Sequence, residues 1–137
     1  MEWSFRIVTK MKYIYFFLLA ITFFNCTAQD KKGISLVDSE VFHKAIAAYK
    51  TQLIDVRTPK EFLSGHIENA VNIHLYDADF ENRINKMDKL KPIYVYCKAG
   101  GRSAEAVAIM REQGFAEIIE LKGGIDAWDD FNLPLVK

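Results

Sequence analysis

The chain has 137 residues, half of them apolar, which is enough to build the core of one ordinary domain. Its 18 Lys and Arg residues balance its 18 Asp and Glu residues, so no net field favours nucleic acid as a partner. The sequence shows no internal repeat and no low-complexity tract. We therefore expect a single compact domain, and a nucleic-acid-binding role has no support.

Residues 1–28 are typical of a signal peptide and are not expected to belong to the fold. Arg6, Lys10 and Lys12 give a basic start, and residues 13–24 form an apolar run interrupted only by a threonine. That run is too short for an ordinary transmembrane helix and has the length of a secretory hydrophobic region. We expect export, to the periplasm or to a membrane surface that faces it.

Two processing sites compete at the end of this segment. Asn25-Cys26 resembles a bacterial lipoprotein site, with lipid on Cys26 attaching the protein to a membrane, although Phe23-Phe24-Asn25 departs from the usual small residues. Cys26-Thr27-Ala28 instead has small residues where ordinary signal peptidase needs them. A short uncleaved membrane anchor is a third alternative. Translation from Met11 would also give a compact signal peptide.

The sequence next predicts three short apolar strands, at residues 34–37, 53–56 and 70–73. A helix between the first two follows from apolar residues at helical spacing, namely Val41, Phe42, Ala45, Ile46 and Tyr49. Thr58 to Glu61 is a helix start, with Thr as N-cap, Pro59 at the first helical position and Glu three residues after the cap. Gly65 is placed to end that helix.

The second half of the chain continues this alternation. Four apolar residues at spacings of four and three predict a surface helix over residues 80–90, namely Phe80, Ile84, Met87 and Leu90. We then expect strands at residues 92–96 and 117–121, a helix from near Ser103 to Gly114, and a short helix at residues 125–131. Alternating short apolar strands and helices predict an α/β domain with a mostly parallel five-stranded sheet and helices on both faces.

Cys97 follows the fourth predicted strand, where a loop with Gly100 and Gly101 leads into a helix. In an open α/β sheet, ligands bind at this edge. The backbone N–H groups of such a loop and the positive end of the helix dipole form a cradle for an anion. With Lys98 and Arg102 beside it, the thiol should be ionised and nucleophilic near neutral pH, and an anionic substrate should be attracted. The alternative is an inert buried thiol.

The pattern Cys-x-x-Gly-x-Arg-Ser resembles the active-site loop of the rhodanese-like sulfurtransferases, and here consists of Cys97, Gly100, Arg102 and Ser103. Residues 53–62 and 65–73 resemble the front signature of that family, and residues 123–128 resemble its closing signature. These three ordered signatures cover essentially all of residues 34–133. The resemblance implies that residues 34–133 form a single rhodanese domain.

The resemblance also implies sulfur transfer. In this family the loop cysteine takes the outer sulfur from a donor such as thiosulfate, becomes a persulfide and passes the sulfur to a nucleophile such as cyanide or another thiol. On this chain Cys97 would be the nucleophile, and Lys98 and Arg102 would bind the anionic donor and the departing sulfite. The resemblance implies no cofactor. The residues expected to surround the substrate are Lys98, Ala99, Gly100, Gly101, Arg102 and Ser103.

Other functions remain open beside sulfur transfer. One is a non-enzymatic rhodanese module or a persulfide relay for a partner protein, although the intact cysteine loop argues against an inactive module. Cysteine phosphatases and arsenate reductases on this fold have five residues between Cys and Arg, whereas four separate Cys97 from Arg102. The shorter loop suits one sulfur atom better than a tetrahedral phosphate or arsenate. One cysteine and three scattered histidines do not make a metal site in this domain.

Asp55 and Arg57 end the second predicted strand, at the sheet edge expected to hold the cysteine loop. The resemblance suggests that they belong to a polar network supporting that loop, and a surface ion pair is the alternative for Arg57. Three other residues are expected to be structural: His66 as a hydrogen-bonding residue, Trp128 as a core aromatic and Ser103 as a helix N-cap.

Overall fold

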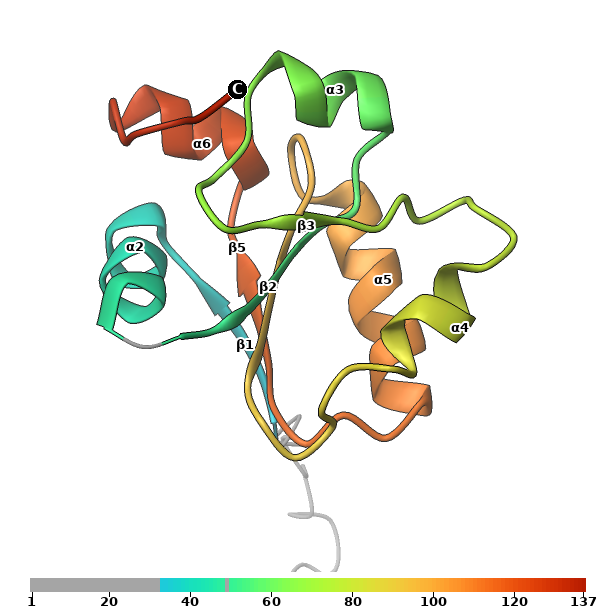
Figure 1. Cartoon of the computed structure of the whole chain (residues 1–137). Helices are drawn as coiled ribbons and strands as arrows, with labels where there is room; N and C mark the ends of the chain where they lie inside the picture. Colours follow the sequence, from blue (N-terminus) through green and yellow to red (C-terminus); the bar gives the residue numbers. More distant parts are fainter. Residues whose placement is uncertain (1–32, 49) are drawn as a thin grey trace, which may run out of the picture. The chain divides into compact units, whose positions relative to one another are not determined.

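The structure is a computed structural model that describes residues 33–48 and 50–137 (Figure 1). The predicted signal peptide and Cys26, the predicted lipidation site, lie outside the described residues. Among the helices that the structure describes, none has the length and apolarity needed to cross a membrane.

Strands and helices alternate along the chain, as the apolar pattern predicts. The strands are β1 (Ile34–Val37), β2 (Gln52–Asp55), β3 (Val71–Asn72), β4 (Ile93–Tyr96) and β5 (Ile118–Leu121). The helices are α2 (Ser39–Ala48), α3 (Pro59–Ser64), α4 (Phe80–Ile84), α5 (Gly101–Glu112) and α6 (Gly124–Asp130). The strands form one sheet in the order β1-β5-β4-β2-β3, and every pairing is parallel, which confirms the predicted fold class.

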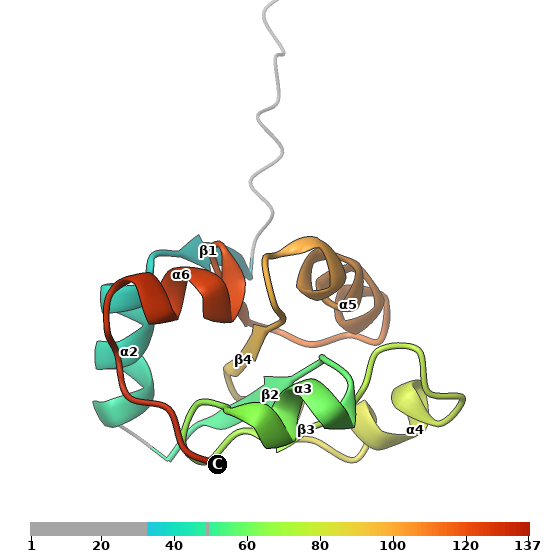
Figure 2. The ribbon, with the colours of Figure 1, turned by 90° about the horizontal axis from the view of Figure 1, so that it is seen from above.

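Helices cover both faces of this sheet, with α4 and α5 on one side and α2 and α6 on the other (Figure 2). The core is divided accordingly into two clusters. On the α5 side, Ile54, Val95 and Ile118 pack with helix residues, and on the α2 side Leu53 and Leu121 do so. Because side chains along a strand alternate between faces, each central strand supplies both clusters, which explains its continuous apolar sequence.

The helix predicted over residues 80–90 is wrong in its length, because α4 ends at Ile84. Phe80 and Ile84 are buried as predicted, but Leu90 is 88% exposed. The Gln52 side chain donates to the Asp88 carbonyl oxygen at 2.9 Å and accepts from the Asp88 backbone N–H at 2.8 Å. These two bonds hold the chain beside the start of β2. Met87 still packs against the core on the α5 side, but Leu90 does not.

Candidate active site

Cys97 lies directly after β4, in a loop at the carboxyl edge of the sheet between α3 and α6 (Figure 1). Its residue is only 1% exposed, and the Gly100 backbone N–H donates to its sulfur at 3.1 Å. Gly100 has a φ of 110°, in the left-handed region that favours glycine, and α5 begins at the next residue. The first N–H groups of α5, which have no partner within the helix, therefore start beside the thiol.

The prediction that Ser103 is the N-cap of α5 is wrong, because Gly100 occupies that position. The positive φ of Gly100 turns the loop straight into the helix, which starts two residues before Ser103. Ser103 is fully buried in the first turn. Its hydroxyl lies 3.4 Å from the Cys97 sulfur and donates to Oε1 of Glu120 at 2.6 Å. Ser103 thus contacts the thiol.

The N-terminus of α6 holds the other side of the loop through the backbone. The N–H of Ile125 donates to the Cys97 carbonyl oxygen at 2.9 Å, and the N–H of Asp126 donates to the Lys98 carbonyl oxygen at 3.0 Å. A Cβ placed on Gly124 would lie 2.4 Å from that Lys98 oxygen. Gly124 therefore permits the close approach of two backbones that the bonds require.

Both cationic side chains predicted to bind the donor are paired with carboxylates. Lys98 Nζ lies 2.7 Å from Oδ1 of Asp126, and both side chains are about half exposed. The Arg102 guanidinium donates two bonds to Glu61, at 2.8 and 2.7 Å. Arg102 thereby holds the pKa of the Glu61 carboxyl well below its usual range, and Glu61 raises the pKa of Arg102. Substrate binding by Lys98 and Arg102 stays a prediction.

Asp55 and Arg57 form a buried ion pair rather than a surface pair, with Arg57 Nη2 2.6 Å from Oδ2 of Asp55. Arg57 also donates to the Gly65 carbonyl oxygen at 2.7 Å, at the end of α3. Its guanidinium lies 5.7 Å from the ring centre of Tyr96, the residue before Cys97. The pair thus connects β2, α3 and the end of β4, and its contact nearest the cysteine loop is this ring.

Two of the three predicted structural residues, His66 and Trp128, have the predicted roles. Nδ1 of His66 lies 3.0 Å from the Phe62 carbonyl oxygen, and Trp128 is 1% exposed in the core. The predicted capping box of α3 is present, since the Thr58 N–H donates to Glu61 at 3.0 Å. Across residues 33–48 and 50–137, no group of three or more His, Cys, Asp or Glu side chains could hold a metal ion.

Four residues at the loop had no functional role in the sequence analysis: Glu61, Glu120, Gly124 and Asp126. Glu61 was explained by its capping box alone, although the same carboxylate also binds Arg102. Glu120 interrupts the otherwise apolar sequence of β5. An acidic residue inside a predicted buried strand is the one sequence signal that could have pointed to a role for it. Gly124 and Asp126 belong to the closing signature, but their contacts with residues 97–98 depend on the fold.

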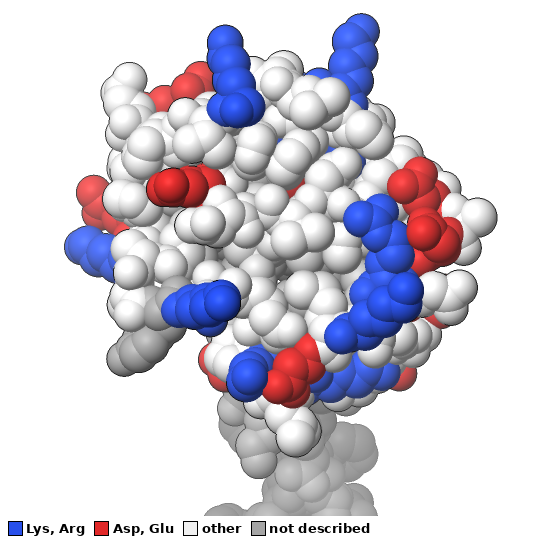
Figure 3. Space-filling model, in the orientation of Figure 1, with Lys and Arg blue, Asp and Glu red and all other residues white. Residues whose placement is uncertain are grey.

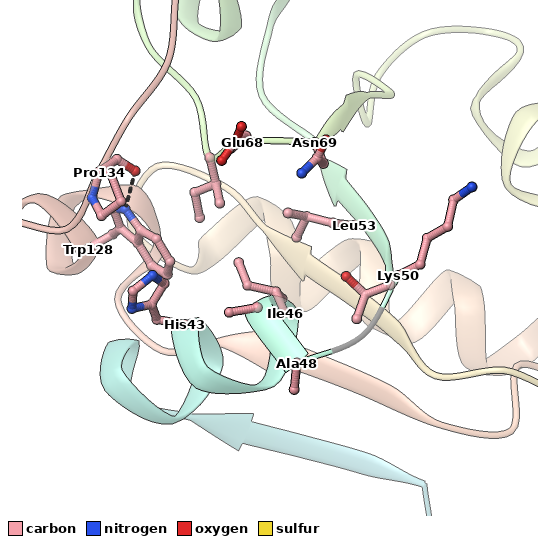
Figure 4. A pocket seen from close by; sticks show the side chains of 12 residues that line it. His43, Ile46, Ala48, Lys50, Leu53, Glu68, Asn69, Trp128 and Pro134 are labelled. Carbon is pink, nitrogen blue, oxygen red and sulfur yellow. Dashed lines mark hydrogen bonds between the residues drawn. The ribbon is translucent and has the colours of Figure 1, made fainter.

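A cavity of about 820 Å³ lies away from the cysteine loop, on the α2 side of the sheet (Figure 4). Its lining includes His43 from α2, Leu53 from β2, Glu68 before β3 and Trp128 from α6. Trp128 Nε1 donates to the Pro134 carbonyl oxygen at 3.1 Å at one end of the cavity. None of residues 97–103 lines it, so it is separate from the candidate site.

Charge is mixed at the surface as well as in the sequence. Lys and Arg lie among Asp and Glu on the face in view, with several Lys and Arg side chains next to one another along its right side (Figure 3). At the cysteine loop, the Gly100 N–H and the start of α5 lie beside the thiol, whereas Lys98 and Arg102 are both paired with carboxylates.

The sequence is similar to known proteins over most of the described part. A family model described as a rhodanese-like domain matches residues 38–130. A protein of Allochromatium vinosum named sulfurtransferase is 32% identical over 104 residues, which cover 75% of this chain and 95% of that protein. An uncharacterized protein of Bacillus subtilis, YqhL, is 46% identical over 79 residues, which cover 58% of this chain and 61% of that protein.

Solved structures agree. The crystal structure of a rhodanese-related protein from Thermoplasma volcanium has a TM-score of 0.66 at 29% identity and covers 74% of this chain and 97% of that chain. The crystal structure of a rhodanese-like domain protein from Staphylococcus aureus has a TM-score of 0.63 at 27% identity and covers 75% of this chain and 99% of that chain. With the family model matched over residues 38–130, a relative at 32% identity covered almost in full, and the shared fold, this chain belongs to the rhodanese-like domain family.

Proposed function

We propose that this protein is a sulfurtransferase that moves a sulfane sulfur from an anionic donor such as thiosulfate to a thiol or cyanide acceptor, through a persulfide on Cys97. The observation that carries the proposal is the Cys97 sulfur, 3.1 Å from the Gly100 nitrogen and beside the start of α5. Hydrogen-bond donors and a helix N-terminus stabilise a thiolate and a persulfide anion.

The proposed reaction has two steps. The Cys97 thiolate attacks the outer sulfur of thiosulfate, so a new S–S bond forms, the bond between the two donor sulfurs breaks and its electron pair leaves with sulfite. The acceptor then attacks the outer persulfide sulfur, and the electron pair of the broken S–S bond returns to Cys97 as a thiolate. The neighbouring N–H groups stabilise the negative sulfur in both states.

A persulfide relay for a partner protein is the second candidate, and the pairing of Lys98 with Asp126 and of Arg102 with Glu61 favours it. A cation already paired with a carboxylate attracts a small anionic donor less strongly than a free one. In both cases we propose that the protein acts after export, with or without lipid on Cys26. That part of the proposal depends on residues 1–28 alone.

The test is the intact mass of the protein before and after thiosulfate. We expect a gain of one sulfur that cyanide removes and that never forms in Cys97→Ala, while Cys26→Ser, the matched variant of the other cysteine, still gains it. No gain with thiosulfate or with a small persulfide donor would overturn both candidates. Gain from the persulfide donor alone would select the relay, and hydrolysis of a phosphoester would select phosphatase chemistry instead.

A further inference from the structure

Glu120 is a buried acid that the proposed reaction leaves without a role. It lies in β5, is 8% exposed, and pairs in register with Val95 of β4 and Leu36 of β1. Its neighbours Ile119 and Leu121 point into the core cluster on the α2 side, so Glu120 faces α5. Burying a carboxyl group in a central strand of a covered parallel sheet costs free energy unless the group is hydrogen-bonded or paired with a charge.

A continuous hydrogen-bond chain joins this acid to the nucleophile. The Cys97 thiol donates to Ser103 Oγ at 3.4 Å, and the Ser103 hydroxyl donates to Oε1 of Glu120 at 2.6 Å. The Gly100 carbonyl oxygen also lies 3.1 Å from Ser103 Oγ. A hydroxyl has only one proton to donate. The carboxylate oxygen of Glu120 is the stronger acceptor and the closer one, so the Ser103 proton is directed at it rather than at the Gly100 carbonyl oxygen.

Burial raises the pKa of the Glu120 carboxyl, and the Ser103 hydrogen bond opposes that shift only in part. Within the described residues, no Lys, Arg or His forms an ion pair with Glu120, because Lys98 and Arg102 are paired elsewhere. The strands beside it bring apolar Val95 and Leu36, and α5 brings Ser103. Accepting a proton would therefore relieve a buried charge without a counter-ion.

We propose that Glu120 is a positioning residue that shares the thiol proton of Cys97 through Ser103. The S–H bond breaks as its proton moves to Ser103 Oγ, and the original hydroxyl proton moves to Oε1 of Glu120. The products are a thiolate, a serine hydroxyl that now donates to it, and a neutral carboxylic acid. One negative charge has moved from the carboxylate to the sulfur, and no proton has left the site.

This proposal rests on the proposed function in that it prepares the Cys97 thiolate for sulfur transfer, but its test needs no transfer. The measurement is the rate at which iodoacetamide alkylates Cys97 in the full chain as a function of pH, with peptide mass spectrometry separating Cys97 from Cys26. Two groups that share one proton titrate in two steps. We expect the wild-type rate to rise in two steps, the first belonging to the shared-proton state.

Glu120→Gln keeps an acceptor oxygen for Ser103 but cannot take a proton or carry charge. We expect a single step in this variant, at a pH between the two wild-type steps, because the first wild-type step requires the acid and the second is delayed by its charge. Glu117→Gln is the matched control, since it removes an exposed carboxylate three residues earlier in the chain and should keep both steps. Ser103→Ala should reduce the first step about fivefold, the effect of one lost hydrogen bond.

A single step in the wild-type protein overturns the proposal and needs no variant to fold. Two steps that persist in Glu120→Gln, or a first step unchanged by Ser103→Ala, also overturn it, and thermal unfolding confirms that each variant is folded. The outcome is separable from that of the proposed function. Two-step alkylation without persulfide formation would support the shared proton but overturn the proposed sulfur transfer. Persulfide formation with one-step alkylation would support sulfur transfer but overturn the shared proton.

Discussion

The α6 side holds the cysteine loop by backbone bonds, whereas the α3 side holds it by a charged side-chain pair. On the α6 side, the N–H groups of Ile125 and Asp126 donate to the carbonyl oxygens of Cys97 and Lys98, and Gly124 leaves no room for a side chain. On the α3 side, Glu61 binds Arg102 through two bonds, and both side chains are partly exposed.

The two supports therefore control different properties. The backbone hydrogen bonds from Ile125 and Asp126 fix where the carbonyl groups of Cys97 and Lys98 lie. A substitution that changes only a side chain leaves these two bonds in place unless it pushes the two backbones apart. The Glu61–Arg102 pair instead sets how much unpaired positive charge lies on the α3 side of the loop, and an isosteric substitution of Glu61 changes that charge with little change in shape. The geometry of the loop should thus be most sensitive on the α6 side and its charge most adjustable on the α3 side.

The strongest test of this difference is Gly124→Ala. The new Cβ would meet backbone atoms of residues 97–98, and Gly124 has a φ of +62°, so collision and strain together should cost about 4 kcal/mol of unfolding free energy. Sulfur loading from thiosulfate should fall at least about a hundredfold, measured by intact mass on the fraction that remains folded.

Gly114→Ala is the matched control for Gly124→Ala. Gly114 has a φ of +88° but nothing within 4 Å of the added Cβ, so the substitution brings strain without collision. We expect a loss of about 1 kcal/mol in urea unfolding and normal sulfur loading. Equal losses in the two variants would mean that the close approach at α6 is unimportant.

A second prediction concerns the buried pair behind the α3 side. Asp55→Asn leaves the Arg57 guanidinium buried without its charge partner, and breaking a buried pair in this way should cost about 3 kcal/mol. Urea unfolding measures the loss. Because Arg57 contacts Gly65 and Tyr96 rather than the loop itself, sulfur loading per folded molecule should stay within about threefold. A large loss of loading with normal stability would contradict this separation.

Glu61→Gln tests the α3 pair through pH. Arg102 lowers the pKa of Glu61 in the folded protein, so this contribution to stability is present above the unfolded value of about 4.3 and is lost as pH falls through the folded value. At pH 7 the variant should be about 1 kcal/mol less stable, and this difference should shrink towards pH 3. Exposed Glu112→Gln, the control, should show no such convergence.

The smallest effect is expected from Asp126→Asn, which frees Lys98. The pair is about half exposed, so stability should hardly change. The extra positive charge should raise the rate of sulfur loading from thiosulfate about twofold at low salt, and added salt should remove the gain. Asp129→Asn, on the same helix without the contact to Lys98, serves as the control. An unchanged rate in Asp126→Asn would remove Lys98 from donor attraction.

Local signals were sufficient for much of the fold. The five strands, the capping box at Thr58 and the position of Cys97 at a strand end follow from apolar spacing and short motifs, which depend on neighbouring residues. The end of α4 does not follow, and the segment after it bonds through Asp88 to Gln52, 36 residues earlier in the chain.

The site shows the same division more strongly. The cysteine, its glycine-rich loop and its helix could be predicted, but Glu61 lies 41 residues from Arg102 and Glu120 lies 17 residues from Ser103. Parallel strands require long connections, so side chains that meet at their carboxyl edge are distant in sequence. A spacing rule along the chain cannot find such partners, and only the sheet order brings them together.

The burial of Cys97 has a chemical consequence of its own. The residue is 1% exposed, so bulky reagents and oxidants meet very little of its own sulfur. A persulfide places a second sulfur about 2 Å beyond the first. An acceptor therefore has to react with the cargo atom rather than with the protein thiol. An empty molecule would therefore react only with small reagents that reach the buried thiol, such as thiosulfate or iodoacetamide, whereas a loaded one would present its outer sulfur to larger acceptors.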